Sequence, residues 1–253
     1  MSVPKQIRVL VLLLLLLPLV ILAFRDDDPR PDWQRTLIVG LYPHNGDGSD
    51  EVQAWIDRLH REDFQPIETF IAEQAARHGL ELERPFEIRL GRPIPNAPPP
   101  PPPVGAGRER MSWAAHLRWW HFRLDRQRLK PDIVMVASYQ QVPADFFNLR
   151  SIGMPSPRLG LSQLAIGQDR HEFNLVVLAH ELLHTVGALD LYRPDGRPEF
   201  PDGYAEPDRQ PRYPQQRAEL MAMVLPVSPQ LSRPPRKLEE VQIGARTAQQ
   251  IGW

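Results

Sequence analysis

Residues 173–187 limit what this chain can fold into more than any other segment. They read FNLVVLAHELLHTVG, with apolar residues at helical spacing until the glycine. The pattern predicts a helix that ends at Gly187 and carries His180, Glu181 and His184. Leu178 and Leu182 lie on the side opposite the histidines and would anchor this helix in the core.

The spacing of the two histidines favours a metal site. Residues four apart stack on one face of a helix, roughly 6 Å from each other, so His180 and His184 can bind one ion. Glu181, rotated by about 100°, can lie beside that ion without binding it. Gly187 allows a sharp turn, after which Asp190 can supply a carboxylate as third ligand. The full string His-Glu-x-x-His-x-x-Gly-x-x-Asp at residues 180–190 is far rarer by chance than its first five residues, His-Glu-x-x-His. The full string is therefore a specific signal.

Composition narrows the chemistry further. None of the 253 residues is a cysteine, which excludes disulfides, thiolate metal sites, iron–sulfur clusters and a cysteine nucleophile. Any metal must therefore be held by His, Asp or Glu. With 30 Lys and Arg against 31 Asp and Glu, the chain lacks the basic field that nucleic-acid binding requires, and we expect no nucleic-acid partner.

The string HELLHTVGALD, residues 180–190, resembles the HExxHxxGxxH/D signature of the metzincin zinc peptidases. Its final aspartate is similar to the snapalysin-like variant. Metzincins also carry a methionine turn beneath the metal, and ELMA at residues 219–222 fits that turn with Met221. Met223 matches less well and is the alternative.

This resemblance implies a zinc-dependent endopeptidase. One Zn²⁺ would be held by His180, His184 and Asp190, with a fourth position open for water. Glu181 would act as general base and acid while a peptide or protein substrate is hydrolysed. Two tyrosines, Tyr192 and Tyr213, are candidates for an additional oxyanion donor, against ordinary packing or loop anchoring.

Residues 1–24 predict export. The apolar run at 9–24 follows Lys5 and Arg8 and precedes Arg25 and three aspartates, so the basic flank leaves the N-terminus in the cytoplasm. The segment is a signal anchor, or a signal peptide if it is cleaved. We accordingly expect a membrane-anchored protein with its catalytic part outside the cytoplasm, periplasmic or extracellular, or a secreted one. Residues 25–35 would form a juxtamembrane linker.

The order of the remaining patterns predicts an α/β (α+β) fold. Strands are expected at 36–42, 86–90 and 132–139, with helical patterns between them. Residues 158–167 alternate in character and contain glycine, which favours an exposed edge strand just before the active-site helix. We expect a metzincin-like mixed twisted sheet with an antiparallel edge strand, which would bind the substrate backbone.

Two subdomains are expected. Residues 36–187 form the upper catalytic subdomain, and residues 188–253 form a small, irregular lower one with the methionine turn and a final helix at 238–253. The upper subdomain contains a proline-rich loop at 92–107 with six consecutive prolines. That loop is a docking site for a proline-recognising partner or a surface insertion.

Residues 111–130 predict an amphipathic helix that begins near Ser112 and ends before Pro131. Its apolar positions follow helical spacing and predict a core stripe rather than a cofactor site. The stripe consists of Trp113, Leu117, Trp120 and Leu124.

Two other classes of function stay open. One is an envelope scaffold with a structural metal, although such a site has no need of Glu181. The other is a docking protein that works through the proline-rich loop and has a degenerate metal site. His171 is undecided, and five further histidines are interpreted as ordinary packed residues: His44, His60, His78, His116 and His121.

Overall fold

The computed structural model describes residues 4, 7, 11–14, 30–98, 107–124, 129–142, 151–156, 158–193 and 195–253. Most of the predicted export segment 1–24 and the centre of the proline-rich loop therefore lie outside the described residues. Within the described part of the chain, no helix is both long and apolar enough to cross a membrane.

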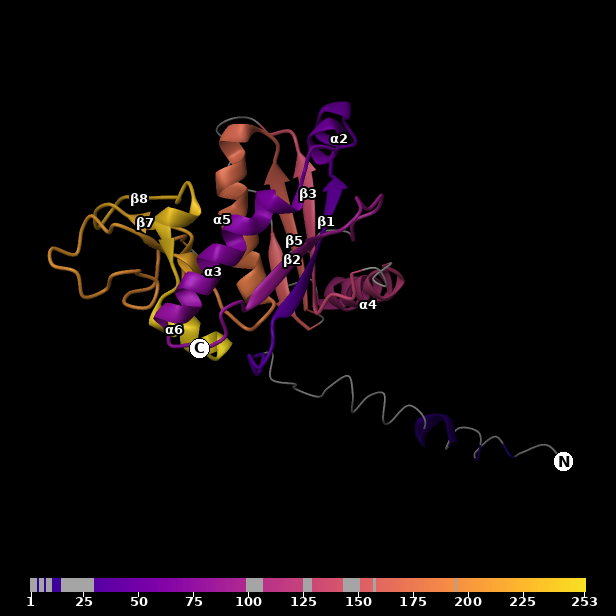
Figure 1. Cartoon of the computed structure of the whole chain (residues 1–253). Helices are drawn as coiled ribbons and strands as arrows, with labels where there is room; N and C mark the ends of the chain where they lie inside the picture. The colour runs from indigo at the N-terminus through magenta and orange to yellow at the C-terminus, as the bar shows by residue number, and fades with distance from the viewer. Residues whose placement is uncertain are drawn as a thin grey trace.

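A five-stranded mixed sheet forms the centre of the molecule (Figure 1). Its strands lie in the order β2-β1-β3-β5-β4. Four of them run parallel, and β4 runs antiparallel to β5. The predicted α/β (α+β) class is thus confirmed, including an antiparallel edge strand. The strands are β1 (Leu37–Asn45), β2 (Phe86–Leu90), β3 (Ile133–Gln140), β4 (Ile152–Pro155) and β5 (Arg158–Ala165).

The edge strand is not the one that the sequence indicated. The predicted edge at 158–167 is β5, which is paired on both sides, to β3 and to β4. Its glycine reflects close packing instead of exposure, because a Cβ at Gly160 would collide with the side chain of Met135. The edge on this side of the sheet is β4, where Gly153 allows an equally close approach to Glu181 and His184; β2 forms the opposite edge.

Helices cover both faces of the sheet (Figure 1). On one face, α3 (Gln65–Arg77) and α5 (Gln168–His184) contribute to the main hydrophobic core. On the other face, α4 (Gly107–Arg123) contributes Leu117 to a smaller core with Tyr42 and Val136. Ser49 caps the short helix α2 (Asp50–Ile56), and η1 (Arg61–Phe64) leads into α3.

The predicted helix at 111–130 corresponds to α4, which begins earlier, at Gly107, and ends at Arg123. Its predicted core stripe is confirmed, because Leu117 is buried and the two tryptophans and Leu124 pack against the same small core.

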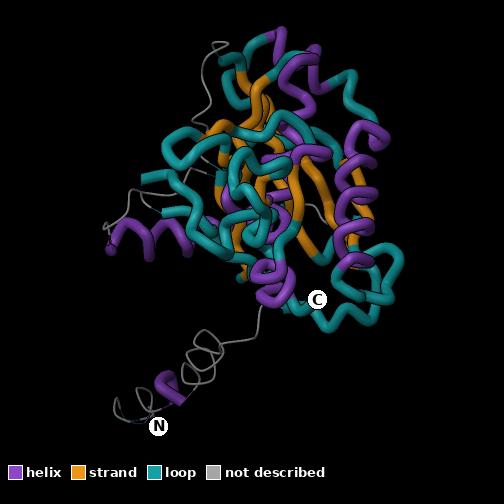
Figure 2. The backbone as a smooth tube through the Cα atoms, turned by 90° about the vertical axis from the view of Figure 1, so that its left-hand side faces the viewer, coloured by secondary structure: helices purple, strands orange, loops and turns teal. Residues whose placement is uncertain are grey.

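The C-terminal part consists mostly of loops (Figure 2). Within it, β6 pairs with β9 and β7 pairs with β8. The predicted helix at 238–253 is shorter than expected, because Gly244 precedes it and residues 241–242 pair with β6 instead. The elements are β6 (Ala218–Glu219), η2 (Leu220–Ala222), β7 (Leu225–Pro226), β8 (Ser232–Arg233), η3 (Leu238–Glu240), β9 (Val241–Gln242) and α6 (Ala245–Ile251).

Trp33 joins the start of the described domain to its end. The side chain is 6% exposed, and its indole N–H donates to the carbonyl of Ile251 at 2.7 Å. Its ring lies edge-on to Phe86 and Trp253. This part of the predicted 25–35 linker therefore packs against the C-terminal end of the chain.

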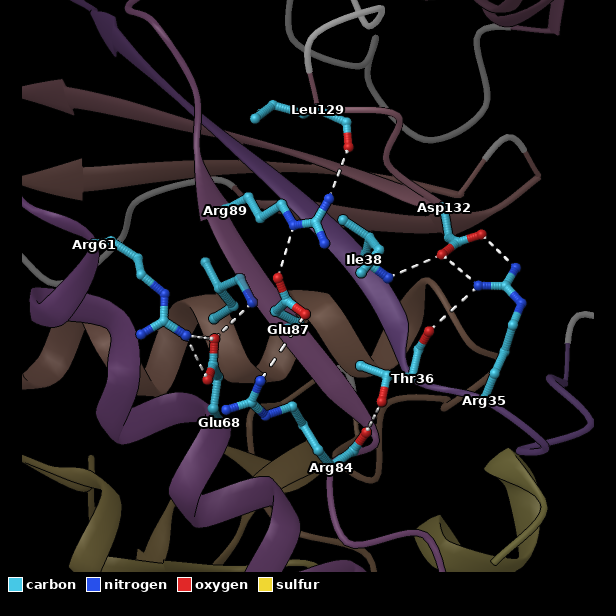
Figure 3. A network of polar contacts seen from close by, with 11 residues as sticks. Arg35, Thr36, Ile38, Arg61, Glu68, Arg84, Glu87, Arg89, Leu129 and Asp132 are labelled. Atoms are coloured by element: carbon cyan, nitrogen blue, oxygen red, sulfur yellow. Dashed lines mark hydrogen bonds and ion pairs between the residues drawn. The ribbon is translucent and has the colours of Figure 1, made fainter.

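Two carboxylates, of Asp132 and Glu68, accept hydrogen bonds from backbone N–H groups of the sheet (Figure 3). Asp132 accepts two hydrogen bonds from Arg35, at 2.6 and 2.9 Å, and one from the backbone N–H of Ile38 at 2.8 Å. Glu68 of α3 accepts from the backbone N–H of Ile88 at 2.6 Å. Both contacts tie a strand to a residue distant in sequence, and they help to fix the register of β1 and β2.

Candidate metal centre

The C-terminal half of α5 brings two imidazoles together. His180 and His184 lie one turn apart, and their Nε2 atoms are 3.1 Å from each other. His180 is 6% exposed, so this meeting point lies against the core. Two ring nitrogens so close need either a shared proton or an ion between them.

The other nitrogen of each ring is held by a backbone carbonyl. His180 Nδ1 lies 3.1 Å from the carbonyl oxygen of Leu220, and His184 Nδ1 lies 2.8 Å from that of Ala188. Because a carbonyl only accepts, each Nδ1 carries the proton and donates it. Both Nε2 lone pairs are then free to bind a metal, and the rings are fixed in orientation.

Asp190 completes the arrangement from the loop after α5. Gly187 has a φ of 105°, a conformation that turns the chain sharply back toward the helix. Asp190 Oδ1 lies 3.4 Å from His180 Nε2 and 3.2 Å from His184 Nε2. Ligand atoms about 2.0–2.1 Å from a tetrahedral zinc ion are roughly 3.3 Å apart, and the three observed separations fit that arrangement.

Electrostatics in the centre favour an ionised Asp190. Burial disfavours its charge, but when the Nε2 atoms of His180 and His184 carry protons, their hydrogen bonds to Asp190 prevail and hold the pKa of Asp190 well below its usual range. Burial likewise opposes charge on His180, yet the hydrogen bond with Asp190 and the nearby carboxylates raise the pKa of His180.

Glu181 lies beside the histidines and is buried. It is 5% exposed, and its Oε1 is 4.0 Å from His180 Nε2. Its Oε2 is buried without a hydrogen-bond partner, and burial raises the pKa of the Glu181 carboxyl. His180, Glu181 and His184 together form a group that could hold a metal ion. An orphaned acceptor in such a position suits a group that receives a proton.

The predicted methionine turn packs directly against this centre. Met221 is fully buried in η2, and its carbonyl accepts from the backbone N–H of Leu191 at 3.0 Å. The preceding carbonyl, of Leu220, is the acceptor for His180. The turn thereby orients the ring of His180 and positions Leu191, the residue next to Asp190. Met223, the alternative, follows the turn in the left-handed conformation, with a φ of 56°.

Glu219 is a residue that the sequence did not single out. Its fully buried carboxylate accepts hydrogen bonds from the backbone N–H groups of Met221, Ala222 and Gly244, and from the hydroxyl of Thr247. Glu219 therefore fastens the methionine turn to the start of α6. The one available signal was an acidic residue directly before the apolar stretch LMA.

The two candidate tyrosines differ in position. Tyr192 lies near Asp190, and burial, the charge of Asp190 and a hydrogen bond with that carboxylate all raise the pKa of the Tyr192 hydroxyl. Tyr213 places its hydroxyl 3.0 Å from that of Tyr204. Among the described contacts, none joins Tyr213 to the two histidines.

Other histidines serve ordinary roles. His44 Nδ1 lies 3.0 Å from the hydroxyl of Ser138, and burial lowers the pKa of His44. His78 contacts the carbonyl of Ile243. His171, which the sequence left undecided, contacts the carbonyl of Asp63 and belongs to no metal-binding group of the described residues.

No protein-family model and no curated protein matches the chain. Metalloproteinase-II from Bacteroides fragilis is a solved structure with 10% identity and a TM-score of 0.42; the match covers 85% of this chain and 52% of that one. OgpA from Akkermansia muciniphila has 15% identity and a TM-score of 0.40, with 89% of this chain and 62% of that one covered.

A third solved structure, of a chaperone-substrate complex, has 14% identity and a TM-score of 0.32, with 61% of this chain and 24% of that chain covered. This chain thus spans less than two thirds of each of the three solved chains. Since every TM-score is below 0.5, these likenesses decide neither family nor activity.

Proposed function

We propose that this chain is a zinc-dependent endopeptidase of the metzincin type. The observation that carries the proposal is the convergence of His180 Nε2, His184 Nε2 and Asp190 Oδ1 within 3.1–3.4 Å of one another, beside a buried carboxylate with an unpartnered oxygen. A donor set of two imidazoles and one carboxylate fits zinc.

The number of ligands favours catalysis over a structural role. Structural zinc sites use four protein ligands, whereas catalytic sites use three and leave a position for water. Zinc held by His180, His184 and Asp190 would supply a Lewis acid and bring the pKa of a water molecule to about 7. An envelope scaffold with a structural metal is therefore the weaker candidate.

Glu181 would move the proton. Its unpartnered Oε2 can accept a proton from the attacking water and return it to the leaving amine. The raised pKa of Glu181 suits both steps. A carboxylate with a higher pKa accepts the proton of water more readily, and its acid form persists to a higher pH, where it can donate the proton to the amine. Tyr192 would support the oxyanion; Tyr213, whose hydroxyl pairs with Tyr204, is the less suitable candidate.

The substrate backbone would bind along β4. Among the described strands, β4 pairs only with β5, so its other side can accept an extended peptide as an added strand. Gly153 brings β4 close to Glu181 and His184, and a peptide on that side would lie near the metal centre. This role replaces the one expected for residues 158–167.

Residues 1–24 would carry this activity out of the cytoplasm, either as an anchor or as a signal peptide that is removed. The catalytic part would then act on peptides or proteins in the periplasm or outside the cell.

The decisive experiment is Glu181→Gln in the purified chain. We expect hydrolysis of casein or a peptide library to fall by about 10²–10⁴-fold, because the general base is lost. Zinc content should stay at that of the unmodified protein. Glu172→Gln, an exposed change on the same helix, is the control and should keep full activity. Full activity of Glu181→Gln would refute the mechanism.

A further inference from the structure

The face of the sheet opposite the metal centre carries a groove that catalysis does not use. It lies between α4 and residues 90–98 and has a volume of about 1060 Å³. Leu117 anchors α4 beneath it, and the indole N–H of Trp120 donates to the carbonyl of Asn96 at 2.8 Å.

The lining of this groove has one sign of charge. Arg92 and Arg123 contribute to it, none of its described lining residues is acidic, and most of the others are apolar or aromatic. In sequence, residues 107–130 contain seven Lys and Arg against two acids, although the whole chain has a net charge of −1. A basic segment of this kind on an otherwise acidic chain points to an anionic partner.

The outer side of α4 combines these cations with an exposed aromatic ring. Trp119 is 60% exposed, and the guanidinium of Arg123 lies 5.7 Å from its ring centroid. Arg118, its neighbour, is also exposed. Tryptophan next to arginine is the combination found at the membrane–water interface, where the ring lies among headgroups and the cation meets phosphate.

The position of this face relative to the chain's entry agrees with a membrane. Leu129 lines the groove, and three residues later Asp132 binds Arg35. Arg35 comes eleven positions after the end of the apolar run at residue 24, a distance of at most ~40 Å when extended. A bilayer that holds the apolar run would therefore lie within reach of this face.

We propose that α4 and its groove form a docking surface for an anionic membrane. Arg118 and Arg123 bind lipid phosphates, and Trp119 enters the headgroup region. The apolar lining of the groove contacts the acyl chains of the lipids. The contact sets how the domain lies on the membrane, with the sheet face that carries α5 turned away from the lipid. It does not depend on the peptidase proposal.

The test uses the full chain reconstituted into vesicles of neutral phosphatidylcholine, or of phosphatidylcholine mixed with phosphatidylglycerol. The detergent-purified protein is the reference for amide hydrogen exchange over residues 112–124. We expect exchange slower than this reference on the anionic vesicles and about equal to it on the neutral vesicles. Brominated lipid in the anionic vesicles should quench the fluorescence of the unmodified chain more than that of Trp119→Phe.

Arg118→Glu combined with Arg123→Glu should abolish both effects. Arg58→Glu combined with Arg77→Glu, an equal change of charge outside α4, should leave them intact. Equal exchange on both kinds of vesicle, quenching that Trp119→Phe does not reduce, or binding of an acidic peptide in place of lipid would each overturn the proposal. Flotation with neutral vesicles separately tests the N-terminal anchor.

Discussion

Glu219 shows how much one buried carboxylate can hold in place. Its two oxygens receive four donors, from η2, the start of α6 and Thr247. The same turn presents the carbonyl of Leu220 to His180. The orientation of His180, a candidate metal ligand, thus depends on a residue that does not touch its ring, as is usual for groups that support metal ligands.

Glu219→Gln should therefore lower both stability and metal affinity. The amide replaces an acceptor with an NH₂ group that faces N–H donors, which costs about 1–3 kcal/mol in the free energy of unfolding. We also expect zinc affinity to fall by about 10–100-fold. Urea unfolding and zinc titration measure the two effects. Glu239→Gln, an exposed change in η3, is the control, and unchanged zinc affinity in Glu219→Gln would exclude a positioning role.

The metal-site residues differ in how far local sequence could predict them. The meeting of His180 and His184 follows from helical periodicity alone, and the return of Asp190 follows from Gly187. The carbonyl that orients His180 lies forty residues further along the chain. No local pattern contains that pairing, and the role of Glu219 stayed hidden for the same reason.

At the scale of elements, β4 packs closely against the part of α5 that carries Glu181 and His184. Gly153 has no room for a side chain, because a Cβ would collide with the carbonyl of Glu181 and the side chain of His184. The edge strand proposed to bind substrate is thus positioned by a glycine.

Gly153→Ala should push β4 away from α5. We expect a loss of about 1–3 kcal/mol in unfolding free energy, as for overpacking elsewhere, and a rise in KM for peptide substrates. Thermal unfolding and steady-state kinetics measure the two. Ser156→Ala, an exposed change next to β4, should alter neither. A Gly153→Ala protein with an unchanged KM would argue against binding along β4.

The strand order explains why one element was assigned wrongly. In β5, the alternation of residue types and the glycine resembled an exposed edge strand. The alternating side chains instead pack into two different hydrophobic cores, one on each face of the sheet, and Gly160 makes room for Met135. The strand at 132–139 was predictable because its continuous apolar run records burial directly, and the strand at 86–90 was predictable from its alternation. The predicted final helix was too long, because residues 241–242 pair with β6 and no local pattern reveals that tertiary contact.

The contact between Asp132 and Arg35 makes the β1–β3 junction sensitive to acid. The hydrogen bonds from Arg35 lower the pKa of Asp132 against the effect of burial, and the N–H of Ile38 adds to the lowering. A carboxyl whose folded pKa is depressed adds stability above its unfolded pKa of about 3.9, and loses it as pH falls through the folded value.

Asp132→Asn should accordingly be less stable than the unmodified protein at pH 7, and the difference should shrink below about pH 4. Urea unfolding at a series of pH values measures it. Asp57→Asn, at the exposed end of α2, should show a smaller effect at every pH. A difference that stays constant down to pH 2 would assign the loss to packing instead of charge.

Across the whole molecule, the candidate metal centre lies against one continuous core. The main hydrophobic cluster includes residues of the sheet, of α5, of the methionine turn and of α6, and it reaches Trp33 at the start of the described domain. The lower part of the chain is therefore packed onto the same helix that carries the histidines. A ligand that joins α5 to the loop at Asp190 would stabilise both parts together.

Zinc should for this reason raise the melting temperature of the whole domain. At a free concentration of 100 times Kd, binding to the folded state alone adds about 2.7 kcal/mol, which corresponds to roughly 5–11 °C for a domain of this size. Differential scanning calorimetry with zinc and with a chelator measures the shift. Glu181→Gln should keep it, because we propose Glu181 as the general base and not as a ligand, whereas Asp190→Ala should lose most of it. Asp195→Ala is the matched control in the same loop. A full shift in Asp190→Ala would remove Asp190 from the ligand set, and the site would then have to recruit another donor.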